Sequence, residues 1–362
     1  MKNKFLFGIL LLAFNLVYAQ DDIIDKEKAL IDSVAAINAA NAANADAMDA
    51  YNQGIAAFEA KDYASAISNY NNAISMQPDF SDAYFNKGVA ELESAKFNNA
   101  IASFDKVITL DPTNTKALNK KAETFLKKSD YKAAANTYEQ SSKIDSKNEK
   151  TFYQWGNALF LNEEYEAAIE KFDAAIAIKG DYAYAYNDRG SCYRMLQDFT
   201  KAINDYNQAV NIDPQMAFVY NNIGAIKKKT GDFQGALAAY TKAQTNDPKF
   251  YLALNNRGSV NMELGKYDEA IKDFNAALSI NGNYAPAYAN LGAAKFKKEQ
   301  YKEALADCNK AVKIDPNHAA GYVNRGIVKE RMRDQKGACT DWEKARKLGS
   351  ELAKTHFVNN CN

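Results

Sequence analysis

Small and apolar residues return along this chain with a period of 34 residues. Within each period they occupy positions 4, 8 and 11, and then positions 20, 24 and 27. Each set has the i, i+4, i+7 spacing that places side chains on one face of an α-helix. The pattern therefore predicts two amphipathic helices per period, joined by a short turn.

Nine copies of the period fit residues 47–352 without insertion or deletion. Position 8 is glycine in all copies except the third, which has Ala122, and position 20 is always alanine. These small residues allow two helix backbones to approach closely, and proline near position 32 ends the second helix because it has no N–H to donate. A single helical pair cannot bury its apolar faces, but stacked pairs can, so the pattern predicts a solenoid.

The repeated phrase resembles the tetratricopeptide repeat, in which an aromatic residue, Leu-Gly, Tyr, Ala, Phe, Ala and Pro follow one another over 34 residues. The resemblance covers residues 47–352 and implies an all-α fold, a right-handed superhelical solenoid of helix-turn-helix repeats. The third copy departs furthest, with Ala122, Ser141 and Ser146 where Gly, Ala and Pro are usual. We expect looser packing there.

The first 19 residues have the three parts of an export signal. Lys2 and Lys4 precede an apolar core from Phe5 to Val17, and small residues at the end of the segment predict cleavage after Ala19. The residue directly after that site is not a cysteine, so a lipoprotein signal is not indicated. The expected location is the periplasm or the extracellular space. An uncleaved anchor or a chance apolar start is the alternative.

Two further segments flank the repeats. Residues 20–46 carry Ile23, Leu30, Val34 and Ile37 on one helical face, which predicts a helix packed on the first repeat, with a flexible spacer as the alternative. Residues 350–362 begin with Ser350, a favourable N-cap, and resemble the extra helix that closes such solenoids.

Composition narrows the class of partner. Lys plus Arg and Asp plus Glu number 45 each, so the chain lacks the basic excess that nucleic-acid recognition requires. Beyond the first twenty residues no stretch is apolar enough to cross a bilayer. A protein or peptide partner is therefore expected, with no nucleic acid and no integral membrane span after signal cleavage. Oligomeric state and partner identity do not follow from the sequence.

Residues that would support catalysis are missing from the sequence. Its two histidines, His318 and His356, have no metal-ligand partner at helical spacing, and neither a phosphate-binding glycine loop nor a nucleophile motif occurs. We expect no enzymatic activity, no cofactor and no metal.

Two groups of residues are expected to stabilise the array. Cys339 and Cys361 stand near the C-terminal end, where an exported protein would join them; two free thiols are the alternative. Position 7 is arginine in three copies, each with aspartate at its own position 23, which predicts structural ion pairs: Arg189 with Asp205, Arg257 with Asp273, and Arg325 with Asp341. A ligand-binding role for these arginines is the alternative.

Asparagine is in excess at position 6, which lies about 200° around the first helix from position 4 and therefore faces away from the helix pairing. It is found there as Asn52, Asn86, Asn222, Asn256, Asn290 and Asn324. Asparagine is 38 of 362 residues in the whole chain and a poor helix former, so six in nine is a positional preference. Related repeat proteins use this asparagine to hold peptide main chain, and Asn221 and Asn255 widen the polar strip. Family consensus without a ligand is the alternative.

Charge is distributed unevenly. The third copy, residues 115–148, has eight lysines and four acids, and Lys116, Lys120 and Lys127 fall on its groove side. They would attract an acidic segment, or form a solvated face. The sequence as a whole predicts a scaffold that binds an extended peptide or partner segment in the concave groove. The alternative function is a non-catalytic accessory subunit that binds cell-envelope polysaccharide.

Overall fold

A computed structural model describes residues 28, 31–36, 41–42 and 44–361. Residues 44–59 are helical, and short turns connect the helices that follow. These are α2 (Tyr63–Met76), α3 (Ser81–Glu93), α4 (Phe97–Leu110), α5 (Thr115–Lys127), α6 (Tyr131–Ile144), α7 (Glu149–Leu161), α8 (Tyr165–Ile178), α9 (Ala183–Met195), α10 (Phe199–Ile212), α11 (Ala217–Lys229), α12 (Phe233–Asn246), α13 (Tyr251–Glu263), α14 (Tyr267–Ile280), α15 (Ala285–Lys297), α16 (Tyr301–Ile314), α17 (Ala319–Arg331), α18 (Gln335–Lys347) and α19 (Glu351–Asn360).

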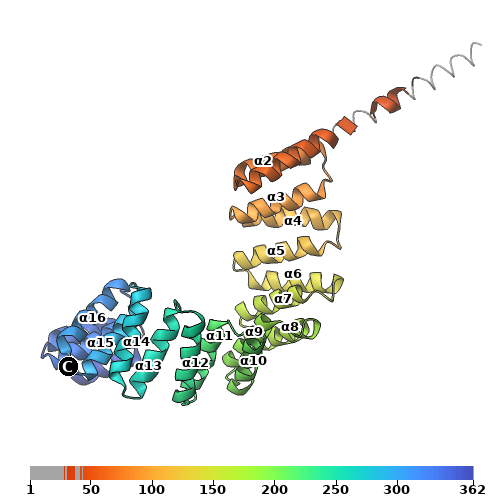
Figure 1. The fold of residues 1–362 in the computed structure, drawn as a ribbon. Helices are drawn as coiled ribbons and strands as arrows, with labels where there is room; N and C mark the ends of the chain where they lie inside the picture. Colours follow the sequence, from red (N-terminus) through yellow and green to blue (C-terminus); the bar gives the residue numbers. More distant parts are fainter. Residues whose placement is uncertain (1–27, 29–30, 37–40, 43, 362) are drawn as a thin grey trace, which may run out of the picture. The chain divides into compact units, whose positions relative to one another are not determined.

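The helices form two compact units, residues 1–162 and 163–362. Within each unit, successive helices pack antiparallel, and each pair stacks on the next (Figure 1). No strand occurs in the described part of the chain, and the fold is the expected all-α solenoid of helix-turn-helix repeats. The expected signal segment, residues 1–19, lies outside the described residues, as does most of residues 20–46. Val34, the described member of the apolar face expected there, is 48% exposed.

The fixed small residues lie where the two helices of a pair cross. Every position-20 alanine is fully buried. A Cβ added to Gly224 would lie 2.7 Å from the ring of Tyr240, and one added to Gly326 would lie 2.4 Å from Trp342. Both distances are too short for non-bonded atoms, so glycine at position 8 makes room for the large side chain at position 24.

The turn between the two helices of a pair places position 15 in the left-handed backbone region. Glycine occupies it at Gly231 (φ +84°) and Gly265 (φ +71°), whereas other copies place residues such as Ala95 (φ +58°) there. A residue with a Cβ is strained in this region. Several turns end in an aspartate, such as Asp232, whose carboxylate accepts a hydrogen bond from the third backbone N–H of the next helix and caps it.

Ala95→Gly and Ala293→Gly are expected to have opposite effects. At Ala95, glycine removes left-handed strain and raises the free energy of unfolding by up to about 1 kcal/mol. At Ala293, inside α15, the same change lowers it by about 1 kcal/mol because glycine is a poor helix former. Urea titration of both variants measures the two values. Equal destabilisation would contradict the strain at position 15.

No helix within the described residues is both long and apolar enough to cross a membrane.

Candidate binding face

Four position-6 asparagines in residues 163–362 lie on successive first helices, α11, α13, α15 and α17; we call them the asparagine row. All four are half-buried. Each donates from Nδ2 to position 5 of the preceding first helix. The acceptors are Asn187 Oδ1 for Asn222 (3.3 Å), Asn221 Oδ1 for Asn256 (3.0 Å), Asn255 Oδ1 for Asn290 (3.0 Å) and the Ala289 carbonyl oxygen for Asn324 (3.0 Å).

These bonds give the positional preference a structural cause that the sequence analysis missed. The acceptors are one position earlier and one repeat back, so the asparagines set the register of neighbouring first helices. The polar residues at position 5, Asn187, Asn221 and Asn255, were the available signal. Asn221 and Asn255 thus act first as acceptors within the protein. Asn255 also donates to Asn256 Oδ1 at 3.5 Å.

The row keeps hydrogen-bonding capacity for a ligand. An amide nitrogen has two hydrogens, and each bond to the preceding helix uses one of them. Within the described residues, no protein group donates to Oδ1 of Asn222, Asn290 or Asn324, and none of these oxygens is among the fully buried atoms that lack a partner. The arrangement therefore offers donors and acceptors at repeat intervals.

The two asparagines predicted nearer the N-terminus belong to residues 1–162 and do not form such a row. Asn86 donates to the Tyr51 hydroxyl at 2.8 Å, and Asn52 is exposed. Position 6 in the next copies is Lys120, Gln154 and Asp188. The structure thus brings together the four C-terminal asparagines, whereas Asn52 and Asn86 belong to the other unit.

An exposed aromatic pair lies next to the start of the asparagine row. The sequence analysis did not single out this pair. The rings of Tyr184 in α9 and Phe218 in α11 stack with centroids 6.3 Å apart, and their exposed fractions are 51% and 37%. Both residues are at position 2, one helical turn before the asparagines of positions 5 and 6, and therefore on the same helix face. The pair is an apolar platform beside polar side chains.

The three predicted arginine–aspartate pairs are also brought together by the structure. Each arginine contacts its aspartate through two nitrogens, Nε and Nη2. The distances are 2.8 and 2.6 Å for Arg189–Asp205, 3.1 and 2.6 Å for Arg257–Asp273, and 2.8 and 2.5 Å for Arg325–Asp341. The aspartates are at most 5% exposed. Such two-point contacts join the two helices of one repeat.

Each arginine also reaches the preceding repeat, which the sequence analysis did not predict. The remaining nitrogen, Nη1, donates to position 25 of that repeat: Asp173 (2.5 Å), Thr241 (3.2 Å) and Asn309 (3.1 Å). The eighth copy has Asp307 at position 23 but Leu291 at position 7, and there Lys295 supplies the cation at 2.5 Å. With all three arginine nitrogens engaged inside the protein, the contacts favour the structural role over ligand binding.

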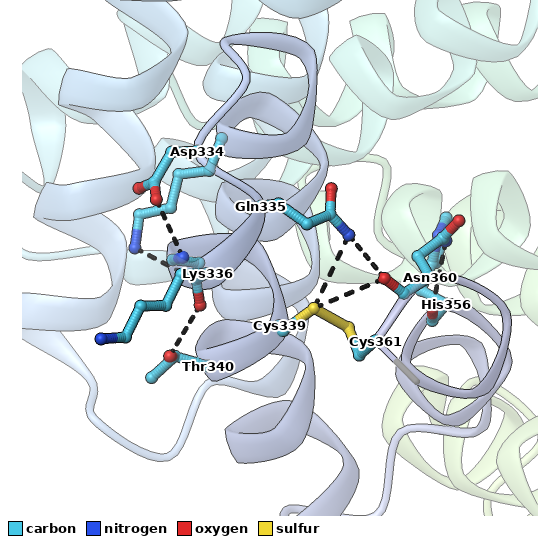
Figure 2. The surroundings of a disulfide bond; sticks show 10 residues. Asp334, Gln335, Lys336, Cys339, Thr340, His356, Asn360 and Cys361 are labelled. Carbon is cyan, nitrogen blue, oxygen red and sulfur yellow. Dashed lines mark hydrogen bonds between the residues drawn. A yellow bond between two sulfur atoms is a disulfide. The ribbon is translucent and has the colours of Figure 1, made fainter.

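A disulfide joins Cys339 in α18 to Cys361, which follows α19. Figure 2 shows Gln335 beside it, donating from Nε2 to the Asn360 carbonyl oxygen at 2.6 Å. Ser350 accepts from the Ala353 N–H and caps α19, and the His356 ring stacks on Trp342 with centroids 4.9 Å apart. The last helix is thus held to α18 by a covalent bond, a hydrogen bond and a ring contact.

We expect non-reducing peptide mapping of the mature protein to find Cys339 linked to Cys361. The other two cysteines, Cys192 and Cys308, are fully buried, and burial raises the pKa of each thiol to about 12. Alkylation of the folded protein should therefore modify neither. In the chain-entropy model, a disulfide that closes a loop of this length stabilises the folded state by about 3 kcal/mol. Cys361→Ser should therefore loosen α19 first. Rapid native alkylation at Cys339 would contradict the linkage.

The histidine, cysteine and carboxylate side chains of the described residues do not gather as a metal site requires. No cluster of three or more His, Cys, Asp or Glu side chains there is arranged to hold a metal ion. His356 packs against Trp342, and burial lowers the pKa of His318 at the start of α17.

Family models agree with this architecture. Models described as tetratricopeptide repeat match residues 51–115, 183–216, 219–250, 251–284 and 285–318, together more than half of the chain. The chain belongs to the tetratricopeptide repeat family. A model described as anaphase-promoting complex, cyclosome, subunit 3 matches residues 93–175 of this tetratricopeptide repeat protein. No curated protein matches it in sequence.

Solved structures share the fold. A tetratricopeptide repeat protein from Parabacteroides merdae is 20% identical with a TM-score of 0.56, over 68% of this chain and 99% of that one. The APC/C hetero-tetramer Cut9–Hcn1 is 16% identical with a TM-score of 0.55, over 82% and 59%. Pseudomonas aeruginosa pilF is 18% identical with a TM-score of 0.51, over 58% and 97%. At these identities the likeness concerns the fold alone.

Proposed function

We propose that this protein is an exported interaction scaffold, without catalytic activity, that holds an extended partner segment along the asparagine row. The observation that carries the proposal is the set of bonds from Asn222, Asn256, Asn290 and Asn324 to their preceding helices. These bonds orient four amides in advance, so a ligand does not have to order them, and binding loses less side-chain entropy.

Amides match the needs of an extended peptide. Each peptide unit has one N–H and one carbonyl, and an asparagine side chain can donate and accept at once. A partner held through its backbone has its side chains free to vary. The row therefore suits a family of related segments, with affinity from repeated main-chain contacts and selectivity from neighbouring surfaces.

The aromatic pair Tyr184 and Phe218 favours a second candidate function. Exposed stacked rings also bind the apolar faces of sugars, so the same face would suit an accessory subunit that binds cell-envelope polysaccharide. A partner peptide would instead place an apolar side chain against the rings. Polysaccharide binding by the unmodified protein that is lost in the Tyr184→Ala/Phe218→Ala variant favours the second function, whereas a peptide held along the asparagine row should lose only part of its affinity.

A photo-crosslinking amino acid at Ala225 or Ala293 tests the proposal. Both residues are at position 9, one turn beyond position 6, and Ala225 is exposed. Crosslinks should form with one short, extended segment of a protein partner. The control site is Lys272, which is exposed on a second helix, α14. Crosslinks of equal yield from Lys272, or none from position 9, would rule out binding along the row.

Export is supported by the tripartite segment at residues 1–19 and by the disulfide, since disulfides persist in oxidising compartments. We propose a periplasmic or extracellular location. Edman sequencing of the mature protein should begin at Gln20; a mature chain that begins at Met1 would contradict cleavage.

A further inference from the structure

Residues 1–162 contain a groove far along the chain from the asparagine row. It has a volume of about 650 Å³ and lies between helices α3, α5, α6 and α7. Phe85, Leu126 and Tyr138 supply its apolar lining, and Lys116, Lys127 and Lys150 are exposed around it. The volume is in the range of sites that bind small ligands or a few peptide residues.

The groove lies at the third copy, which departs furthest from the repeat pattern. Position 8 is Ala122, whereas a Cβ added to the corresponding glycine of other copies would overlap the ring at position 24. In the third copy, either the ring at position 24 or the spacing of the two helices must therefore differ from the other copies, and Tyr138 lines the groove. Ala122, Ser141 and Ser146, from which looser packing was expected, thus lie in the copy that forms the groove, and its helices α5 and α6 are unbroken.

The charge of the groove is positive. Lys120 is paired with Glu123 at 2.7 Å, and Glu123 is the one acidic residue of the lining. Within the described residues Lys116, Lys127 and Lys150 have no ion-pair partner. Three cations converge on one apolar hollow, in a chain whose formal net charge is zero. This local excess attracts carboxylates.

The wall of the groove also contains a polar atom that no protein group satisfies. Asn119 donates from Nδ2 to Thr151 Oγ1 at 3.0 Å, but its Oδ1 is buried and has no hydrogen-bond partner. A buried acceptor without a donor is unfavourable by about 1–3 kcal/mol. The hydrogen-bonding groups in the groove wall are therefore not all satisfied within the protein.

We propose that this groove binds an acidic segment of a partner protein, with a large apolar side chain of that segment on Phe85, Leu126 and Tyr138 and flanking carboxylates near Lys116, Lys127 and Lys150. The inference does not depend on the asparagine row. A peptide fits better than a nucleic acid because the groove is short and the chain as a whole has no basic excess.

The test uses the full-length mature chain and a fluorescent peptide, Glu-Glu-Trp-Glu-Glu, with both ends blocked. Lys127→Gln with Lys150→Gln should weaken binding about tenfold, because two partly exposed charge contacts are lost. The matched control, Lys132→Gln with Lys147→Gln, changes net charge equally at exposed lysines outside the groove and should leave affinity unchanged. Replacing the probe's glutamates with glutamine, or its tryptophan with alanine, should also weaken binding.

Two outcomes would overturn the inference: equal affinity of the groove variant and its control, or a single-stranded oligonucleotide that displaces the probe more effectively than unlabelled peptide does. Circular dichroism checks that both variants are folded. The fourfold alanine variant of the asparagine row should keep its affinity for this probe. Failure at the groove and failure at the row are therefore distinguishable.

Discussion

Replacing Asn222, Asn256, Asn290 and Asn324 together with alanine is expected to weaken partner binding about a thousandfold. Each neutral hydrogen bond contributes about 1 kcal/mol, and a single Asn→Ala change should therefore lower affinity only about fivefold. Calorimetry with the crosslinked segment as a synthetic peptide measures both. The size of the combined effect comes from four weak contacts made by one ligand.

The same variant is expected to be slightly less stable. By helix propensity alone, each Asn→Ala change would raise the free energy of unfolding by about half a kcal/mol. The structure adds a loss, because each amide also bonds the preceding helix at 3.0–3.3 Å, and such a bond contributes about 1 kcal/mol. The thermal midpoint should therefore fall by a few degrees while the helix content stays constant.

A matched control separates the two effects. Asn204, Asn207, Asn211 and Asn275 are exposed asparagines on second helices of the same unit. Changing these four to alanine should leave affinity unchanged and raise stability slightly. If the row variant unfolds, or if folded row variant and control bind the segment equally well, the asparagine row has a structural role only.

Asp273→Leu is expected to lower the free energy of unfolding by about 3–5 kcal/mol, the range for breaking a buried ion pair. Asp273 is 5% exposed and accepts from Arg257 twice and from Asn261 at 3.0 Å. Its loss leaves a guanidinium without its counter-charge between two packed helices. Arg257→Leu should have a comparable effect because it leaves the carboxylate buried. Urea titration gives both values.

The double variant Arg257→Leu/Asp273→Leu should be less destabilised than the sum of the single variants, by more than about 1.5 kcal/mol, because neither charge is then left alone. The control cycle uses Lys143 and Glu139, an exposed pair 2.7 Å apart in α6, where coupling should stay below about 0.5 kcal/mol. Strict additivity at Arg257 and Asp273 would mean that their contact contributes nothing to stability.

The repeat architecture was predictable from sequence because its causes are local. The pattern repeats every 34 residues, and its glycine at position 8 and alanine at position 20 indicate which helix faces meet and how closely. The family matches and the helix bounds agree with that prediction. The arginine–aspartate pairs were also predictable, since both members recur at fixed positions of the same copies and the two helices of a pair are antiparallel neighbours.

Contacts between repeats needed the tertiary structure. The bond from Asn256 to Asn221, the third contact of Arg257 with Thr241 and the groove beside Tyr138 depend on how one helical pair stacks on the next. That stacking angle comes from side-chain packing summed over the whole interface, so no single position of the pattern encodes it. The sequence by itself determined the helices, their pairing and the residues that face each other within a repeat. Only the tertiary structure decided which side chains join neighbouring repeats and where a groove opens, because these contacts and the groove lining come from helices of different repeats.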